Sequence, residues 1–285
     1  MMRLLATSAA AFAAATLLTP TPAAGQIAAV GGYNSVLGIH LAAGRVLTLA
    51  PGASLILGAA YAEATGTDLL AVLTVARPLP GGWRASFEAS HGALGGDYRV
   101  DRLPEAGLAA GGRIADSVFQ YGLELGAGFY RVRPAGVSGF RAQALARLST
   151  VPIPLGRVLS VSAEAGYWQA AYGSAGHGAG WGIVRLGAAL STDTLLTLTY
   201  ARQVTTGASP LRFDALSPDH SLTASFAARP APGIVLTHSQ TYSLLTSSVS
   251  NRIYRLSVER GGHGLFLSWD QIEQKASLFY RWSPP

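Results

Sequence analysis

Apolar and polar side chains alternate with a period of two through most of this 285-residue chain. In residues 119–126, Phe119, Tyr121, Leu123 and Leu125 alternate with Gln, Gly and Glu. Successive side chains of a β-strand point to opposite faces, so this pattern predicts strands with one apolar face. Similar segments recur at 159–167, 221–228 and 277–282. Their lengths approach the roughly ten residues with which a tilted strand crosses a bilayer.

The low charge of the chain favours a wall that faces lipid. Charged residues make up 13% of the sequence, against roughly 25% in soluble domains. An Arg or Lys on a lipid-facing strand costs roughly 2–4 kcal/mol at the bilayer midplane. The net charge is +6, but the arginines are spread singly and form no basic run or helix. We therefore expect no nucleic-acid partner. The absence of cysteine excludes disulfides, a thiolate metal site and a lipoprotein anchor.

The first 25 residues have the pattern of an export signal. A short basic start, with Arg3, precedes an apolar, alanine-rich segment at 4–18, and a Thr-Pro-Thr-Pro run then breaks any helix. Small residues at 23–25 predict cleavage between Gly25 and Gln26. The alternative, a membrane anchor helix, needs about 20 apolar residues. The sequence thus predicts a signal peptide at 1–25 and one β-barrel at 26–285.

The C-terminal segment 275–282 reads Lys-Ala-Ser-Leu-Phe-Tyr-Arg-Trp, with Leu278, Tyr280 and Trp282 on one face. It resembles the final strand of bacterial outer-membrane β-barrel proteins, which commonly ends in an aromatic residue and guides barrel assembly. Here residues 283–285 follow the aromatic. The resemblance implies an outer-membrane location, contact with outer-membrane lipid and with the barrel assembly machinery, and Tyr280 and Trp282 as the assembly signal.

Connections between the predicted strands alternate in kind. Short Pro/Gly turns at 50–52, 78–82, 152–156 and 230–233 alternate with longer, more polar connections such as 92–105, 173–179 and 206–219. Short periplasmic turns and longer extracellular loops are typical of outer-membrane barrels. We expect a transmembrane antiparallel up-and-down β-barrel of about 14–16 strands, preferably 16, whose last strand ends at the periplasm. Segment 26–33 is the candidate first strand. The rival interpretation is a soluble β-sandwich or propeller.

If the apolar face meets lipid, the opposite face of each strand lines the interior. By this parity, charged side chains of both signs face inward on neighbouring strands: Arg84, Glu88, Glu124, Arg141, Arg147, Glu164, Arg185 and Arg255. One interpretation is a charged constriction in a porin-like channel for small polar solutes, in which an arginine excess favours anions. The alternative is cross-strand pairing that stiffens a non-conducting structural barrel.

The chain contains no Gly-x-Ser-x-Gly elbow and no His-Glu-x-x-His motif. Asp219-His220 and His238-Ser239 are the nearest candidates for an acid–base or nucleophile pair, and neither has an evident orienting partner. An outer-membrane hydrolase is therefore the third alternative, behind the channel and the structural barrel. We expect no enzyme activity, no cofactor and no metal site.

Overall fold

The computed structural model describes residues 27–34, 38–63, 66–94, 98–133, 135–261 and 263–282, so the predicted signal peptide lies outside the described residues. The described chain is dominated by one antiparallel sheet. Its strands are β1 Ile27–Asn34, β2 Gly38–Ala50, β3 Ala53–Ala62, β4 Gly66–Pro78, β5 Trp83–Leu94, β6 Arg99–Arg113, β7 Phe119–Arg133, β8 Val137–Thr150, β9 Ile153–Leu155, β10 Leu159–Tyr172, β11 Ala175–Ser191, β12 Thr194–Gly207, β13 Asp219–Ala231, β14 Ile234–Ser243, β15 Ser248–Arg260, β16 His263–Asp270 and β17 Lys275–Trp282.

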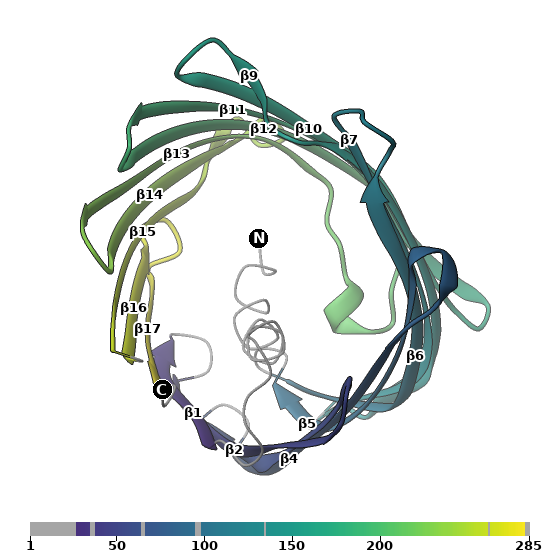
Figure 1. Cartoon of the computed structure of the whole chain (residues 1–285). Coiled ribbons are helices and arrows are strands. Elements are labelled where there is room, and N and C mark those ends of the chain that lie inside the picture. The colour runs from purple at the N-terminus through teal and green to yellow at the C-terminus, as the bar shows by residue number, and fades with distance from the viewer. Residues whose placement is uncertain are drawn as a thin grey trace.

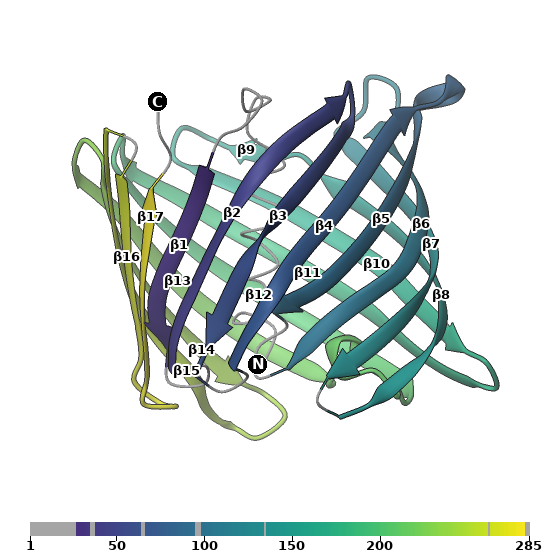
Figure 2. The ribbon, with the colours of Figure 1, turned by 90° about the horizontal axis from the view of Figure 1, so that it is seen from below.

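Sixteen of these strands form the barrel wall, as the alternation predicts. The three-residue β9 lies within the connection from β8 to β10, and β8 pairs directly with β10. Each other strand pairs with its neighbour in the chain, and β1 pairs with both β2 and β17. The first and last strands are therefore neighbours, and the tilted strands form a ring when seen along its axis (Figures 1 and 2). Strand β1 confirms the predicted first strand at 26–33, shifted by one residue.

The connections divide between the two ends of the barrel. At one end, called the turn end here, lie the tight turns at 51–52, 192–193 and 232–233. At the other, the loop end, lies the longest described connection, residues 208–218 between β12 and β13. Several strands extend further toward the loop end than predicted, because β6 and β11 include much of segments 92–105 and 173–179. Within the described ranges, no helix is long and apolar enough to span a membrane.

The outer wall carries the apolar side chains that the alternation assigns to lipid. On β7, Leu123, Leu125 and Phe129 are 38%, 48% and 45% exposed, whereas inward-facing Tyr130 is 2% exposed. Large apolar side chains exposed in every part of the sheet would be unfavourable in water, because soluble proteins seldom expose wide apolar patches. A hydrocarbon surrounding removes that cost, so this wall favours a membrane barrel over the soluble sandwich or propeller.

Candidate functional site

The connection between β12 and β13 enters the barrel interior (Figure 1). This segment, residues 208–218, is called the inserted loop here, and it contains the short 3-10 helix η2 Arg212–Asp214. The sequence predicts a polar extracellular loop at 206–219. That prediction is wrong about the position of the loop, because Leu211 and Asp214 are only 1% and 3% exposed. The loop packs against the inner face of β7, β8, β10 and β11.

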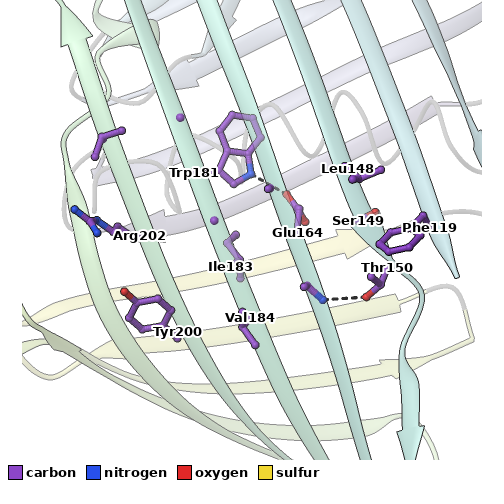
Figure 3. Close-up of a pocket in the computed structure, with 15 residues that line it drawn as sticks. Phe119, Leu148, Ser149, Thr150, Glu164, Trp181, Ile183, Val184, Tyr200 and Arg202 are labelled. Carbon is purple, nitrogen blue, oxygen red and sulfur yellow. Dashed lines mark hydrogen bonds between the residues drawn. The ribbon is translucent and has the colours of Figure 1, made fainter.

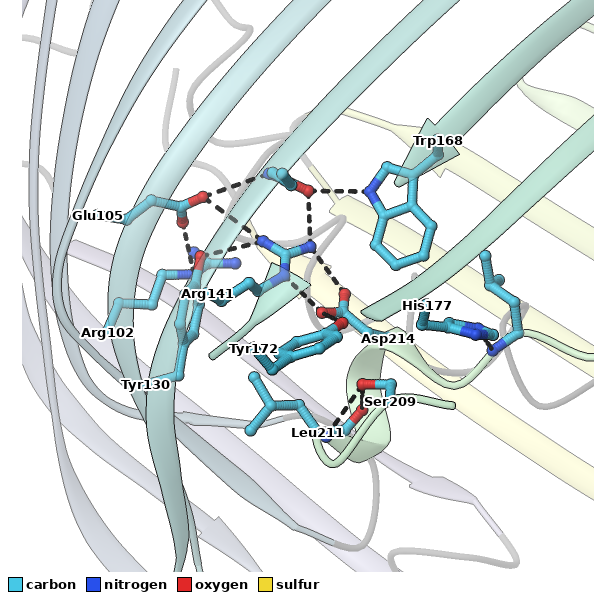
Figure 4. Close-up of polar contacts among 12 residues, drawn as sticks. Arg102, Glu105, Tyr130, Arg141, Trp168, Tyr172, His177, Ser209, Leu211 and Asp214 are labelled. Carbon is cyan, nitrogen blue, oxygen red and sulfur yellow. Dashed lines mark hydrogen bonds and ion pairs between the residues drawn. The ribbon is translucent and has the colours of Figure 1, made fainter. Parts of the chain in front are cut away.

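Asp214 anchors the inserted loop to the barrel wall (Figure 4). Arg141 of β8 donates from Nη2 to its Oδ1 at 2.7 Å and from Nε to its Oδ2. The Tyr172 hydroxyl of β10 also donates to Oδ2, at 2.5 Å. A two-pronged guanidinium–carboxylate contact fixes both distance and orientation. Arg141 is itself only 7% exposed, so each charge of the pair is removed from water together with its partner.

The Arg141 contact extends into a polar network on the barrel wall (Figure 4). Arg141 Nη2 donates to Gln143 Oε1 at 2.6 Å, and the Trp168 indole donates to the same oxygen at 3.0 Å. Gln143 in turn donates to Glu105 at 3.5 Å. Arg102 pairs with Glu105 at 3.4 Å and with Glu88. Charges from β5, β6 and β8 and the loop carboxylate thus form one continuous network, and most of its charges are compensated inside the barrel.

An apolar cluster fixes the other side of the inserted loop. Leu211 contributes to a buried group that consists otherwise of inward-facing wall residues: Tyr98, Tyr130, Val132, Trp168, Ala170, Tyr172 and Ala179. Phe213 and Leu216 of the loop pack against this group. Large apolar side chains on a lumen face would meet water unless something covered them. The sequence signal for the insertion is therefore twofold. Large apolar residues occupy inward-facing positions of the strands, and three further apolar residues, Leu211, Phe213 and Leu216, occur in an otherwise polar loop.

His177 of β11 holds the base of the inserted loop. Its Nε2 accepts a hydrogen bond from the Leu216 backbone N–H at 3.1 Å. Its Nδ1 lies 3.0 Å from the Thr206 carbonyl oxygen, which can only accept. The two contacts together assign the neutral tautomer with the proton on Nδ1. His177 therefore links the end of β12 to the inserted loop that follows it.

The structure places all eight of the charged residues singled out by parity on the inner face. Arg141 contacts the inserted loop, so the side chains at 143, 145 and 147 also face inward. The register continues this face to Glu164 and Arg185, because Gly166 pairs with Arg147 and Ser162 pairs with Arg185. It also reaches the remaining members of the set: Arg84, Glu88, Glu124 and Arg255.

Only some of these inner charges come together. Glu164 and Arg185 lie 3.7 Å apart, and the Trp181 indole donates to Glu164 at 3.0 Å. Glu88 pairs with Arg102, and Arg141 with Asp214, partners that parity alone does not identify. Among the described residues, no carboxylate lies within ion-pair distance of three arginines: Arg84, Arg147 and Arg255.

The inner face of β13–β17 has a different chemistry. Short hydroxyl side chains are frequent on this face: Ser221, Thr223, Ser225, Ser239, Thr241, Ser243, Ser257, Ser268 and Ser277. The same face also carries Ile253, Arg255 and Asp270. Thr223 and Thr241 share a 2.9 Å hydrogen bond across neighbouring strands. The interior therefore has a densely charged wall covered by the inserted loop and a second wall, called the hydroxyl wall here, that is rich in Ser and Thr and includes Arg255. Between the loop and the charged wall lies a cavity of about 470 Å³ that reaches Arg141, Trp181 and Asp219.

A second ionic cluster ties the loop end of β3–β7 together. Arg99, 3% exposed, donates to the carbonyl oxygens of Gly66 at 2.6 Å and Gly92 at 3.1 Å. Arg133 pairs with Asp68 at 2.8 Å and Asp101 at 3.0 Å. Because these contacts join consecutive hairpins through backbone oxygens, this cluster fixes the shape of the rim.

The two residue pairs considered for catalysis are each divided between the faces of a strand. Asp219 faces inward and contacts Ser221, whereas His220 faces outward and lies 3.0 Å from the Tyr200 hydroxyl. His238 stacks on Tyr254 of the outer wall, and Ser239 faces the lumen. Neither pair can act as a dyad in this geometry. Within the described ranges, no three His, Asp or Glu side chains are grouped to hold a metal ion.

The two residues of the predicted assembly signal belong to the last strand. Tyr280 lies on the outer wall, 45% exposed, with its hydroxyl 2.5 Å from Nδ1 of His263. The backbone of Trp282 pairs with His263 and with Ala29 of the first strand. Strand β17 therefore completes the contact between the first and last described strands.

Comparison with known proteins identifies the fold. No family model and no curated protein matches the sequence. Among solved structures, BamA from Haemophilus ducreyi lacking POTRA domains 1–3 has a TM-score of 0.56 at 12% identity, covering 92% of this chain and 71% of that one. CdiB from Acinetobacter baumannii has a TM-score of 0.55 at 10% identity, covering 91% and 59%. The outer membrane protein OpdK from Pseudomonas aeruginosa has 0.50 at 10% identity, covering 90% and 97%. The chain therefore has the fold of bacterial outer-membrane β-barrel proteins.

Proposed function

We propose that the chain is an outer-membrane channel for passive diffusion of small polar solutes, narrowed by the inserted loop and weakly selective for anions. The observation that carries this proposal is the combination of sixteen strands with a lumen wall that is rich in short hydroxyl side chains. Small barrels are filled by their own side chains, whereas barrels of about 16 strands leave an aqueous channel. A wall of Ser and Thr leaves space and offers hydrogen bonds to water and polar solutes.

The inserted loop supports a narrowing rather than a complete plug. It is held to one side, against β7–β11, by Arg141 and by the apolar cluster around Leu211. The hydroxyl wall of β13–β17 has none of the loop contacts found among the described residues. Solutes would therefore pass between the loop and the hydroxyl wall, which offers Ser and Thr hydroxyls together with the Arg255 guanidinium.

The unpaired arginines support the preference for anions. Arg84, Arg147 and Arg255 lie in the half of the lumen nearer the turn end, whereas the acids around the loop are largely neutralised by Arg102 and Arg141. A guanidinium without a carboxylate partner attracts anions in a low-dielectric channel more strongly than a neutralised pair does. Glu124 opposes this effect on β7, which limits the expected preference to a weak one.

Export completes the proposal. A signal peptide at 1–25 would carry the chain across the inner membrane, and the barrel assembly machinery would insert it with the turn end at the periplasm. The pattern of the N-terminal residues and the aromatic face of the last strand support this route. The rival interpretation is a non-conducting structural barrel with the same location.

Conductance in planar bilayers distinguishes the channel from the structural barrel. Purified barrel should conduct. Under a KCl gradient, the sign of the reversal potential should show that chloride permeates more readily than potassium. Replacing Arg147 and Arg255 by Gln should reduce that potential, whereas Arg45→Gln should not, because Arg45 lies on the outer wall opposite Leu57. Absence of conductance from correctly folded protein would refute the channel, and unchanged selectivity in the double variant would refute the role of these arginines.

A further inference from the structure

The outer wall contains an apolar groove of about 600 Å³ across five strands, β7, β8, β10, β11 and β12 (Figure 3). Its floor consists of small outward-facing residues: Ala163, Ala165, Gly180 and Gly182. Phe119 and Leu148 border it toward the turn end, and Tyr200 and Val204 border it on β12. The outer wall is therefore hollowed here, between large apolar side chains on β7, β8 and β12.

Missing side chains create this groove. Leu148, Ala165, Gly182 and Arg202 are paired in that order across four neighbouring strands. The two middle positions of this row therefore have only small side chains or none. A Cβ placed on Gly182 would meet no atom within 4 Å, and one on Gly180 would meet nothing closer than 3.7 Å. The space is thus open to the surroundings of the barrel and is filled by no side chain of its own.

Arg202 stands at the β12 end of the groove. Ala201 and Gln203 face inward, and Gln203 donates to the Ser217 carbonyl of the inserted loop at 2.7 Å, so Arg202 faces outward. Its guanidinium has no hydrogen-bond or ion-pair partner among the described residues. Beside it, the Tyr200 hydroxyl lies 3.0 Å from His220 Nε2 on the next strand. One cation and two further polar groups therefore gather where the apolar floor ends.

The charge of the outer wall is one-sided. Arginines face outward on several strands: Arg45, Arg77, Arg131, Arg202 and Arg252. On the described strands no Asp or Glu is exposed on this wall, since their carboxylates face the lumen or belong to the rim cluster. Cations without acids on a lipid-facing surface are complementary to anionic lipid headgroups.

We propose that this groove binds one phosphorylated lipid, with an acyl chain along Ala165 and Gly182 and a phosphate on Arg202. Arginine favours phosphate because its planar fork donates two charge-assisted hydrogen bonds. Arg202 lies in the half of β12 nearer the loop end, which the proposed orientation places in the outer leaflet. The occupant is therefore the phosphorylated glycolipid of that leaflet, lipid A. This inference rests on the proposed outer-membrane location and not on conduction.

Native mass spectrometry of the full barrel in detergent tests the site with lipid A as the probe. The wild-type barrel should retain one lipid A. Arg202→Gln and Gly182→Leu should each weaken binding at least tenfold, as should removal of the lipid's phosphates. Arg252→Gln and Ala224→Leu are matched controls, because they change an outward arginine and an outward small residue away from the groove.

Fold and conduction are checked on the same samples. Ala165→Leu fills the same row as Gly182→Leu, so it replaces that variant if Gly182→Leu fails to fold. Both groove variants should conduct like wild type, which separates failure of the lipid site from failure of the channel. Equal retention of lipid A by wild type, Arg202→Gln and the groove variants would overturn the proposal. Equal affinity for phosphatidylglycerol would overturn the assignment to lipid A.

Discussion

Replacing Asp214 by Asn should release the inserted loop. The substitution keeps the size of the side chain but removes the charge that faces Arg141 at Oδ1 and Oδ2. Removing one member of a buried ion pair costs about 3–5 kcal/mol, because the other charge stays buried. Arg141 retains the Tyr130 hydroxyl at 3.2 Å and Glu105 at 3.9 Å, so we take about 3 kcal/mol, near the lower limit of that range.

That free energy converts into a change of population. A loss of about 3 kcal/mol increases the released fraction roughly 100-fold, since about 1.4 kcal/mol corresponds to a factor of ten. Leu211, 1% exposed, still holds the loop by apolar burial, and Leu211→Ala removes about 2–3 kcal/mol more. The single variant should therefore open transiently, and the Asp214→Asn/Leu211→Ala double variant should be open for a substantial part of the time.

Limited trypsin digestion measures the opening. The loop contains one basic residue, Arg212, and a protease cannot enter the barrel to reach it. When opening and closing are fast, the cleavage rate follows the population of the open form. Cleavage after Arg212 should therefore accelerate roughly 100-fold in Asp214→Asn, and conductance should rise in the double variant. Asp219→Asn is the control, because Asp219 contacts Ser221 and, among the side chains that the structure describes, no arginine. Equal cleavage in wild type, control and Asp214→Asn would refute the anchoring role.

Three further predictions concern the loop, the wall and assembly. His177→Phe removes the acceptor of the Leu216 N–H and the donor to Thr206, so trypsin should cut the loop about tenfold faster, as expected for roughly 1–1.5 kcal/mol of hydrogen bonding. Gly58→Ala places a Cβ 2.1 Å from the Ala43 carbonyl oxygen, so the barrel should lose about 1–3 kcal/mol in denaturant titrations. Gly139→Ala, where a Cβ meets nothing within 4 Å, should match wild type. Tyr280→Ser removes an outward aromatic of the last strand that contacts His263, so less folded barrel should reach the membrane fraction, while a normal yield would contradict the assembly role.

The barrel could be predicted from the sequence because one physical pattern repeats in every strand. Period-two alternation fixes which face of a strand is apolar, and the strand register places Glu124, Arg147 and Arg255 on the opposite face. The count of sixteen strands follows from the same pattern once β9 is recognised as part of a turn. Each of these features is local, so a single sequence contains the information that determines it.

The pairing of the inner charges could not be predicted in the same way. Arg141 and Asp214 are 73 residues apart, and only the path of the inserted loop brings them together. Parity assigns a side chain to a face but says nothing of what else enters the lumen. Glu88 illustrates the same limit, because its partner Arg102 precedes a bulge that shifts the register between β5 and β6.

The positions of the arginines change the interpretation of the net positive charge. An arginine excess suggests an anion-selective lumen if all arginines are assumed to face inward. In the structure Arg102, Arg141 and Arg185 each pair with an inner acid, and the arginines without such a partner are divided between the turn-end half of the lumen and the outer wall. Because the outer wall faces lipid and carries no exposed acid on the described strands, part of the net charge acts on the membrane rather than on the solute. Selectivity and lipid contact are therefore separable properties of this barrel, and substitutions on opposite faces of one strand should change one without the other.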